Sequence, residues 1–159
     1  MTERFTIISV ERYPSGAGDA LHQERHAPML KDSKAFSGFS VDDLQKAKEF
    51  YGQTLGLEVN ETPEGLGLNF KGGGQVFIYS KPDHAPASFT VLNFQVDKID
   101  EAVEELSQRG VSFERYGGDM EQDAKGIFRG AESGQGPNIA WFTDPAGNVL
   151  SVLEGDGQS

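Results

Sequence analysis

The sequence predicts an α+β fold built from two similar modules, each with the order strand, helix and three strands (βαβββ). Two repeated blocks carry this prediction. The residues Phe39-Ser40-Val41-Asp42 are matched 55 positions later by Phe94-Gln95-Val96-Asp97. A second block, Gly74-Gln75-Val76-Phe77, is matched 73 positions later by Gly147-Asn148-Val149-Leu150. Two matches in the same order favour a duplication over a chance similarity.

The first module is predicted over residues 35–80. A strand at 35–41 runs into Asp42-Asp43, which can cap the start of a helix. Apolar residues at helical spacing and a stop at Gly56 define that helix. They are Leu44, Ala47, Tyr51 and Leu55. Three further strands are expected at 57–61, 67–70 and 75–80.

The second module is predicted over residues 88–155. A strand at 89–96 meets Asp97, the expected N-cap of a helix that ends at Gly110. Strands are then expected at 111–115, 139–142 and 149–153. The sequence Asp144-Pro145-Ala146-Gly147-Asn148 is typical of a tight turn, because Pro fixes φ and Gly accepts a positive φ.

Two segments fall outside this pattern. Residues 1–34 are polar and interrupted by Pro14 and Pro28, so we interpret them as an N-terminal arm. Residues 117–137 are long and glycine-rich, yet they contain Ile127-Phe128. They are either a mobile flap over a ligand site or an ordinary connection whose Phe128 packs on the sheet edge.

Composition excludes several classes of function. A formal net charge of −11 argues against binding to nucleic acid and to anionic membrane surfaces. Cysteine is absent, so disulfides and thiolate chemistry are not available. No apolar run approaches the length of a membrane span, and the N-terminus is too polar for a secretory signal. The cytoplasm is therefore the expected compartment.

Several of these segments together resemble one family. Phe39–Leu44 with Phe50-Tyr51 and Leu55-Gly56-Leu57, the block at Phe94–Asp97 and the turn at 141–148 are similar to the glyoxalase/bleomycin-resistance/extradiol-dioxygenase (vicinal oxygen chelate) superfamily. The resemblance covers about residues 35–154. It implies paired βαβββ modules whose mixed sheets curl around a cup that holds the ligand. It also implies a homodimer.

The resemblance places metal ligands of the family's enzymes at four inward strand positions. Counted on this sequence, these positions are Phe36, Ile78, Val91 and Ser151. None of these residues is a good ligand for a divalent ion, so we predict a site without metal and without another cofactor. His22 and His26, and the run Asp119–Asp123, are interpreted as solvated polar segments.

Strand alternation supplies the other candidate ligand-binding residues. Ser40, Asn93 and Gln95 share faces with the counted positions and would be polar points in an otherwise apolar cup. Trp141 could stack on a planar ligand, and Phe128 could close over it. Each also has a structural alternative, in which Phe36 and Val91 fill a closed core and Asn93 and Gln95 satisfy backbone groups.

Three functions remain open from the sequence. The first is a metal-free protein that binds a small organic molecule in the cup. The second is an enzyme of the same superfamily, of the lyase or dioxygenase type, with a divalent metal at unexpected ligands or without one. The third is an interaction module in which the cup has closed. The fold alone does not choose between them.

Overall fold

The structure, a computed structural model, describes residues 29–155 of the chain. The chain forms two units, Met1–Lys34 and Ala35–Ser159. The described part of the first unit holds one short exposed 3-10 helix, η1 (Leu30–Asp32). His22, His26 and the rest of the predicted arm up to residue 28 lie outside the described residues. Everything below concerns the second unit.

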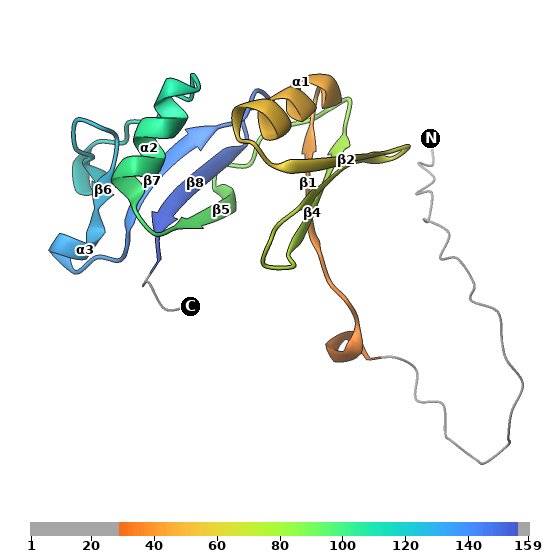
Figure 1. Cartoon of the computed structure of the whole chain (residues 1–159), viewed down its shortest axis with the longest axis horizontal. Helices are drawn as coiled ribbons and strands as arrows, with labels where there is room; N and C mark the ends of the chain where they lie inside the picture. Colours follow the sequence, from red (N-terminus) through yellow and green to blue (C-terminus); the bar gives the residue numbers. More distant parts are fainter. Residues whose placement is uncertain (1–28, 156–159) are drawn as a thin grey trace, which may run out of the picture. The chain divides into compact units, whose positions relative to one another are not determined.

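The first module folds as strand, helix and three strands (Figure 1). Its elements are β1 (Ser37–Val41), α1 (Leu44–Glu49), the π-helix η2 (Phe50–Thr54), β2 (Glu58–Thr62), β3 (Gly65–Asn69) and β4 (Gln75–Ser80). The sheet order is β1-β4-β3-β2, with β1 parallel to β4. Asp43 caps α1 by accepting a hydrogen bond from the Lys46 backbone N–H at 3.0 Å.

The second module repeats this order with additions before its third strand. Its elements are β5 (Thr90–Val96), α2 (Ile99–Gln108), η3 (Gly118–Met120), β6 (Phe128–Arg129), α3 (Gly130–Ser133), β7 (Asn138–Thr143) and β8 (Val149–Glu154). The sheet order is β5-β8-β7-β6, with β5 parallel to β8. The predicted α+β fold of tandem βαβββ modules is thereby confirmed.

Two predicted details are wrong. The N-cap of α2 is Lys98, not Asp97, and it makes no side-chain cap. The Glu154 carboxylate at the end of β8 instead accepts from the Ile99 N–H at 3.3 Å. The strand expected at 111–115 is reduced to a single bridge between Phe113 and Phe142, because β6 takes the place beside β7.

The alignment of the two modules also needs a shift of one residue. The glycines with matching backbone conformation are Gly73 and Gly147, each with φ of 86°. Their offset is 147 − 73 = 74, whereas the sequence comparison gave 73 by matching Gly74 with Gly147. The strand pairing agrees, since Gly38 pairs with Phe77 and Asn93 pairs with Ser151. Phe77, not Ile78, is therefore the equivalent of Ser151.

A buried hydrogen-bond network joins the two modules. The Asp144 carboxylate, 4% exposed, accepts from the Tyr51 hydroxyl at 2.7 Å and from the Asn148 amide at 2.9 Å. Its other oxygen accepts from the Ala146 and Asn148 backbone N–H groups, which closes the β7–β8 turn. The Asn148 amide also donates to the Ser40 carbonyl at 2.9 Å, so the turn is tied to β1.

Aromatic contacts also join the two modules. Phe50 lies 6.4 Å from Phe142 between ring centroids, and Phe70 lies 6.1 Å from Phe94. Burial, the neighbouring Asp144 charge and the hydrogen bond to it together raise the pKa of Tyr51 far above its usual value. The phenol therefore keeps its proton and donates it in the hydrogen bond to Asp144. A single cluster of buried residues includes side chains of both modules.

We expect the change Tyr51→Phe to lower the free energy of unfolding by about 1–3 kcal/mol, because it leaves a buried carboxylate short of one donor. Urea denaturation followed by circular dichroism measures this. Tyr116→Phe is the control, because Tyr116 is 38% exposed. Equal midpoints for the parent and for Tyr51→Phe would contradict a stabilising role for the network.

Candidate functional site

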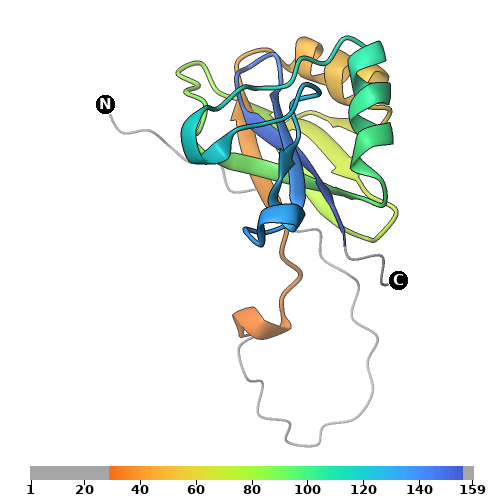
Figure 2. The ribbon, with the colours of Figure 1, turned by 90° about the vertical axis from the view of Figure 1, so that its left-hand side faces the viewer.

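Each sheet has one face covered by its helix and one face turned away from it, which we call the open face. In the second module, Phe94, Phe142 and Val152 lie on the helix side. Because neighbours along a strand point to opposite sides, Asn93, Trp141 and Ser151 lie on the open face. Figure 2 shows α1 and α2 near each other on one side of the strands.

Three open-face residues form one row across the second sheet. Asn93 of β5 pairs with Ser151 of β8, and Ser151 pairs with Trp141 of β7. The Ser151 hydroxyl is fully buried and donates to the Asn93 side-chain carbonyl at 2.6 Å. Asn93 itself is exposed, and its amide N–H groups meet no acceptor within residues 29–155. This row has a hydrogen-bond donor, Asn93, at one end and an indole ring, Trp141, at the other.

A hollow of about 360 Å³ lies at the Trp141 end of this row. Aromatic and aliphatic groups from β6, β7 and η3 dominate its lining, and Asp119 and Gln135 supply the polar groups. The apolar lining residues are Met120, Phe128, Pro137, Ile139 and Trp141. The Trp141 ring is held from two sides, 5.6 Å from Tyr116 and 6.4 Å from Phe128 between centroids.

The open face of the first module carries a second aromatic surface. Phe77 and Tyr79 stack with ring centroids 6.3 Å apart and an angle of 18° between planes. Glycine flanks Phe77 in both neighbouring strands, Gly38 on β1 and Gly67 on β3. A side chain at Gly38 would come within 3.1 Å of the Phe77 backbone carbonyl, so glycine leaves this ring uncovered on that side.

The predicted site residues fall into different places. Asn93, Gln95, Trp141 and Ser151 lie on the open face of the second sheet, and Phe128 contacts Trp141 at its edge. Ser40 lies on the open face of the first sheet. Ile78 is fully buried on the helix side, so its placement in the cup is wrong. The cause is the one-residue shift at the three consecutive glycines.

The two remaining predicted residues, Phe36 and Val91, lie at irregular points. Phe36 precedes β1 and is 66% exposed. Val91 lies at a bulge in β5, where pairing steps from Thr90 to Leu92, and it packs partly against the core. Phe77 and Tyr79 were missed as open-face residues. Gly73, with its positive φ, is the glycine that aligns with Gly147, and this alignment puts Phe77 and Tyr79 on the open face. The sequence does not show which of the three consecutive glycines takes that conformation.

Ser40 is engaged by a partner from the linker between the modules. Its hydroxyl lies 2.7 Å from His84 Nδ1, and His84 Nε2 lies 3.0 Å from the Ala146 carbonyl. A carbonyl can only accept, so Nε2 donates to it and Nδ1 accepts from the Ser40 hydroxyl. Ser40 and His84 therefore hold the linker against both modules.

The segment 117–137 packs against the second module and pairs with its sheet. This finding corrects the prediction of a mobile flap. Ile127 is fully buried, and Phe128 is 9% exposed in β6, paired with Ile139 at the edge of the sheet. Arg129 donates two hydrogen bonds of 2.8 Å to the Asp100 carboxylate on α2 and one of 2.9 Å to Asp123.

These ion pairs have a clear electrostatic consequence. Hydrogen bonds from Arg129, and then from Lys125, hold the pKa of the Asp100 carboxyl well below its usual range. The Asp100 carboxylate is therefore charged when the folded protein is near neutral pH.

The segment 117–137 thus matches the second of the two alternatives that the sequence left open. It is an ordinary connection, and its Phe128 packs on the edge of the sheet.

The described residues offer no ready metal site. Between residues 29 and 155, no three His, Asp or Glu side chains gather closely enough to hold an ion. The corrected register exchanges Ile78 for Phe77 among the four counted positions, and neither side chain is a ligand. The run at Asp119–Asp123 lies partly in η3, and Asp123 uses its carboxylate on Arg129 and on the Ile127 N–H.

Comparison with known proteins now assigns the family. The model of the Glyoxalase/Bleomycin resistance protein/Dioxygenase superfamily matches residues 36–152. The chain belongs to this superfamily. The resemblance drawn from the sequence is confirmed, and the matched range spans both modules. A search of curated proteins finds no match.

Solved structures share the fold of this superfamily member. A glyoxalase/bleomycin resistance protein from Streptomyces is 25% identical, with 75% of this chain and 99% of that chain covered and a TM-score of 0.50. An antibiotic-binding protein from Streptomyces is 24% identical (80% and 98% covered, TM-score 0.54). The fosfomycin resistance protein FosX from Listeria monocytogenes is 16% identical (79% and 94% covered, TM-score 0.56).

One further structural finding concerns membranes: between residues 29 and 155, no helix has the length and apolar character needed to cross a bilayer. The longest described helix, α2, has only 10 residues.

We expect protein purified without chelator to contain no stoichiometric transition metal, because Phe36, Phe77, Val91 and Ser151 cannot replace His or Glu as ligands. Elemental analysis by mass spectrometry measures this. Protein dialysed against zinc and then passed over a desalting column serves as the control for weak surface binding. About one zinc, iron, nickel or manganese per chain would overturn the expectation and favour an enzyme.

Proposed function

We propose that this superfamily member binds a small planar organic molecule on the open face of its second module, without a metal. The observation that carries the proposal is the hollow beside Trp141, which combines an aromatic and aliphatic lining with two polar residues, Asp119 and Gln135. Ligand pockets in proteins have this composition and volumes of about 300–1,000 Å³. The hollow of about 360 Å³ lies within that range.

The arrangement favours a ligand with a flat apolar body and a hydrogen-bond acceptor at one end. Trp141 presents a large ring whose position is set by Tyr116 and Phe128. A ligand that stacks on this ring therefore causes little loss of side-chain conformational entropy. The donor is the Asn93 amide, which lies outside the hollow on the same face, two strands from Trp141. Its orientation is fixed because Ser151 already donates to the Asn93 carbonyl oxygen.

The relatives support binding rather than a particular ligand. The proteins of similar fold named above include one described as antibiotic-binding and two described as resistance proteins. At identities of 16% to 25% these likenesses do not transfer a substrate. The ligand class proposed here therefore rests on the residues of this chain.

We also propose that the chain is a homodimer. The open face of the first module exposes Tyr79, with the half-buried Phe77 stacked beside it, and Phe36 at 66% and Phe89 at 68% exposure add further aromatic surface. Exposed aromatic residues in such number are typical of an interface or a ligand site. A second copy of the chain could cover this surface around a two-fold axis.

The binding proposal is tested by screening a metabolite and antibiotic panel for thermal shifts, followed by titration of Trp141 fluorescence. A ligand of the native state raises the melting temperature by mass action. The chain has a single tryptophan, so its emission reports on this site. We expect Asn93→Ala to weaken binding about fivefold or more through loss of one hydrogen bond.

The control and the second variant for this titration are chosen by how exposed each side chain is. Asn60→Ala changes an exposed asparagine at the edge strand β2 and should leave affinity unchanged. Phe128→Leu is preferable to Phe128→Ala, because truncating a ring that is 9% exposed to Ala would cost about 3–5 kcal/mol of stability. If Asn93→Ala and Phe128→Leu both bind like the parent, the open face is not the site.

Light scattering after size exclusion tests the homodimer. One chain has a mass of 17.3 kDa, so we expect 2 × 17.3 = 34.6 kDa at micromolar concentration. Tyr79→Lys places a charge on the exposed aromatic surface and should shift the mass toward that of one chain. Lys48→Ala, on α1, is the control. A parent protein of 17.3 kDa under these conditions would contradict the dimer.

A further inference from the structure

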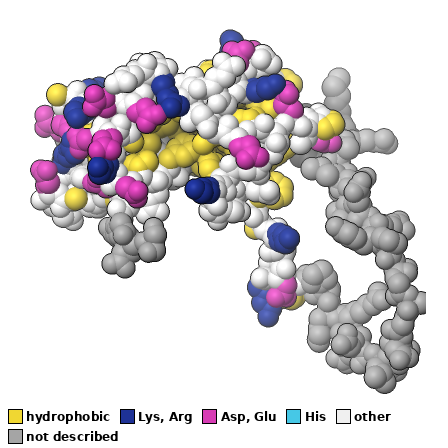
Figure 3. All heavy atoms as spheres, in the orientation of Figure 1, with side chains coloured by type: hydrophobic (Ala, Val, Ile, Leu, Met, Phe, Trp, Pro, Cys, Tyr) yellow, Lys and Arg dark blue, Asp and Glu magenta, His cyan; other side chains and the backbone are white. Residues whose placement is uncertain are grey.

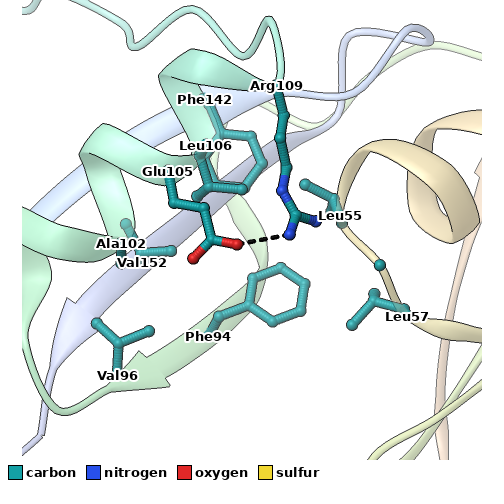
Figure 4. Close-up of a pocket in the computed structure, with 11 residues that line it drawn as sticks. Leu55, Leu57, Phe94, Val96, Ala102, Glu105, Leu106, Arg109, Phe142 and Val152 are labelled. Atoms are coloured by element: carbon teal, nitrogen blue, oxygen red, sulfur yellow. Dashed lines mark hydrogen bonds and ion pairs between the residues drawn. The ribbon is translucent and has the colours of Figure 1, made fainter.

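A second hollow lies on the opposite side of the second sheet, between the two modules (Figure 4). Its volume is about 320 Å³. Phe94 and Val152 form its floor, Leu106 and Ala102 of α2 form one wall, and Leu55 and Leu57 of the first module form the other. In Figure 3 apolar side chains gather in a band between the modules, with charged side chains on both sides of it.

The hollow lies between the helical segments of the two modules. The first segment, α1 with η2, ends at Gly56, whose φ of 72° turns the chain away into β2. A side chain at Gly56 would come within 3.2 Å of the Arg109 guanidinium. The space between the helices is bridged instead by Arg109, which donates to the Thr54 carbonyl at 3.3 Å.

Arg109 supplies the polar group at the rim. It also pairs with Glu105, one turn earlier on α2, at 2.5 Å, as the dashed line in Figure 4 shows. A guanidinium has five N–H donors, and these two contacts use two of them. The remaining donors can serve a ligand without breaking either contact. Because Glu105 already balances the charge, a neutral acceptor suits this position better than a carboxylate.

We propose that this hollow between the modules is a second small-molecule site, for a neutral apolar compound that carries one carbonyl or ether oxygen. The apolar body would lie on Phe94 and between Leu55 and Leu106, and its oxygen would accept a hydrogen bond from Arg109. The volume is at the lower end of the range for ligand pockets of about 300–1,000 Å³, so the ligand is small.

A small molecule fits this place better than a second protein chain does. The rim is closed on one side by the Arg109–Glu105 pair and the Thr54 carbonyl, which limits the apolar opening. A stable protein interface buries about 800 Å² on each partner, much more than so small a hollow offers. The site is independent of the one beside Trp141, since the two lie on opposite sides of the second sheet.

The test is a titration of the full chain with benzylacetone, an aromatic ring joined to one ketone, up to about 5 mM. Carbon–proton spectra of the methyl groups report on the hollow. We expect saturable shifts of the Leu55, Leu57 and Leu106 methyl groups. Ala102→Leu fills the hollow from a half-buried position on α2 and should abolish these shifts.

Two variants separate the parts of the proposal. Arg109→Met keeps the apolar stem but removes the donor, and should weaken binding about tenfold. Asn93→Ala, on the open face, should leave it unchanged. Absence of saturable shifts at the three leucines would overturn the proposal, as would shifts confined to Ile139 and the Trp141 ring. Arg109→Met binding like the parent would overturn the assigned role of Arg109.

A different result would assign the hollow to a second copy of the chain. In that case the Leu106 methyl shift would depend on protein concentration, and benzylacetone would have no saturable effect. That outcome also overturns the proposal. Thermal denaturation in the presence of benzylacetone gives a second measurement, because a ligand held by both modules raises the melting temperature by mass action.

Discussion

The arrangement of the two modules depends on the hydrogen bonds that the buried Asp144 carboxylate accepts. Its two oxygens accept from Tyr51 of the first module and from donors within its own turn. An unpaired charge at 4% exposure would be strongly destabilising, so all of these donors are needed together. Asp144 therefore sets the direction of the β7–β8 turn, and Asn148, held by Asp144, ties that turn to β1.

The same network determines which open-face residues remain available to a ligand. Asn148 holds the Ser40 carbonyl, and His84 takes the Ser40 hydroxyl while donating to Ala146. Ser40 is thus part of the junction between the modules. Asn93 is different, because Ser151 satisfies its carbonyl oxygen and leaves its N–H groups accessible. Similar polar residues on equivalent strands of the two modules thus have opposite roles.

Sequence reasoning succeeded where alternation was unambiguous and failed where a single residue decided the outcome. The row Asn93–Ser151–Trp141 follows from regular alternation in β7, in β8 and in the part of β5 after its bulge, which are long enough to fix which side chains face the helix. Ile78 was misplaced because three glycines allow two alignments and only the positive φ of Gly73 selects one. The two-residue strand β6 is too short to show a periodic pattern, so its pairing with β7 could not be predicted from the sequence.

The second sheet, rather than an enclosed cavity, is the element common to both proposed ligand sites. Strands β7 and β8 carry Trp141 and Ser151 on one side and Phe142 and Val152 on the other. A ligand on either side contacts the same two backbones, whose spacing is set by the ladder hydrogen bonds. Because neighbours along a strand point to opposite sides, a ligand on one face does not touch the side chains that form the site on the other face. A variant on one face, such as Asn93→Ala, therefore tests its own site without changing the lining of the other.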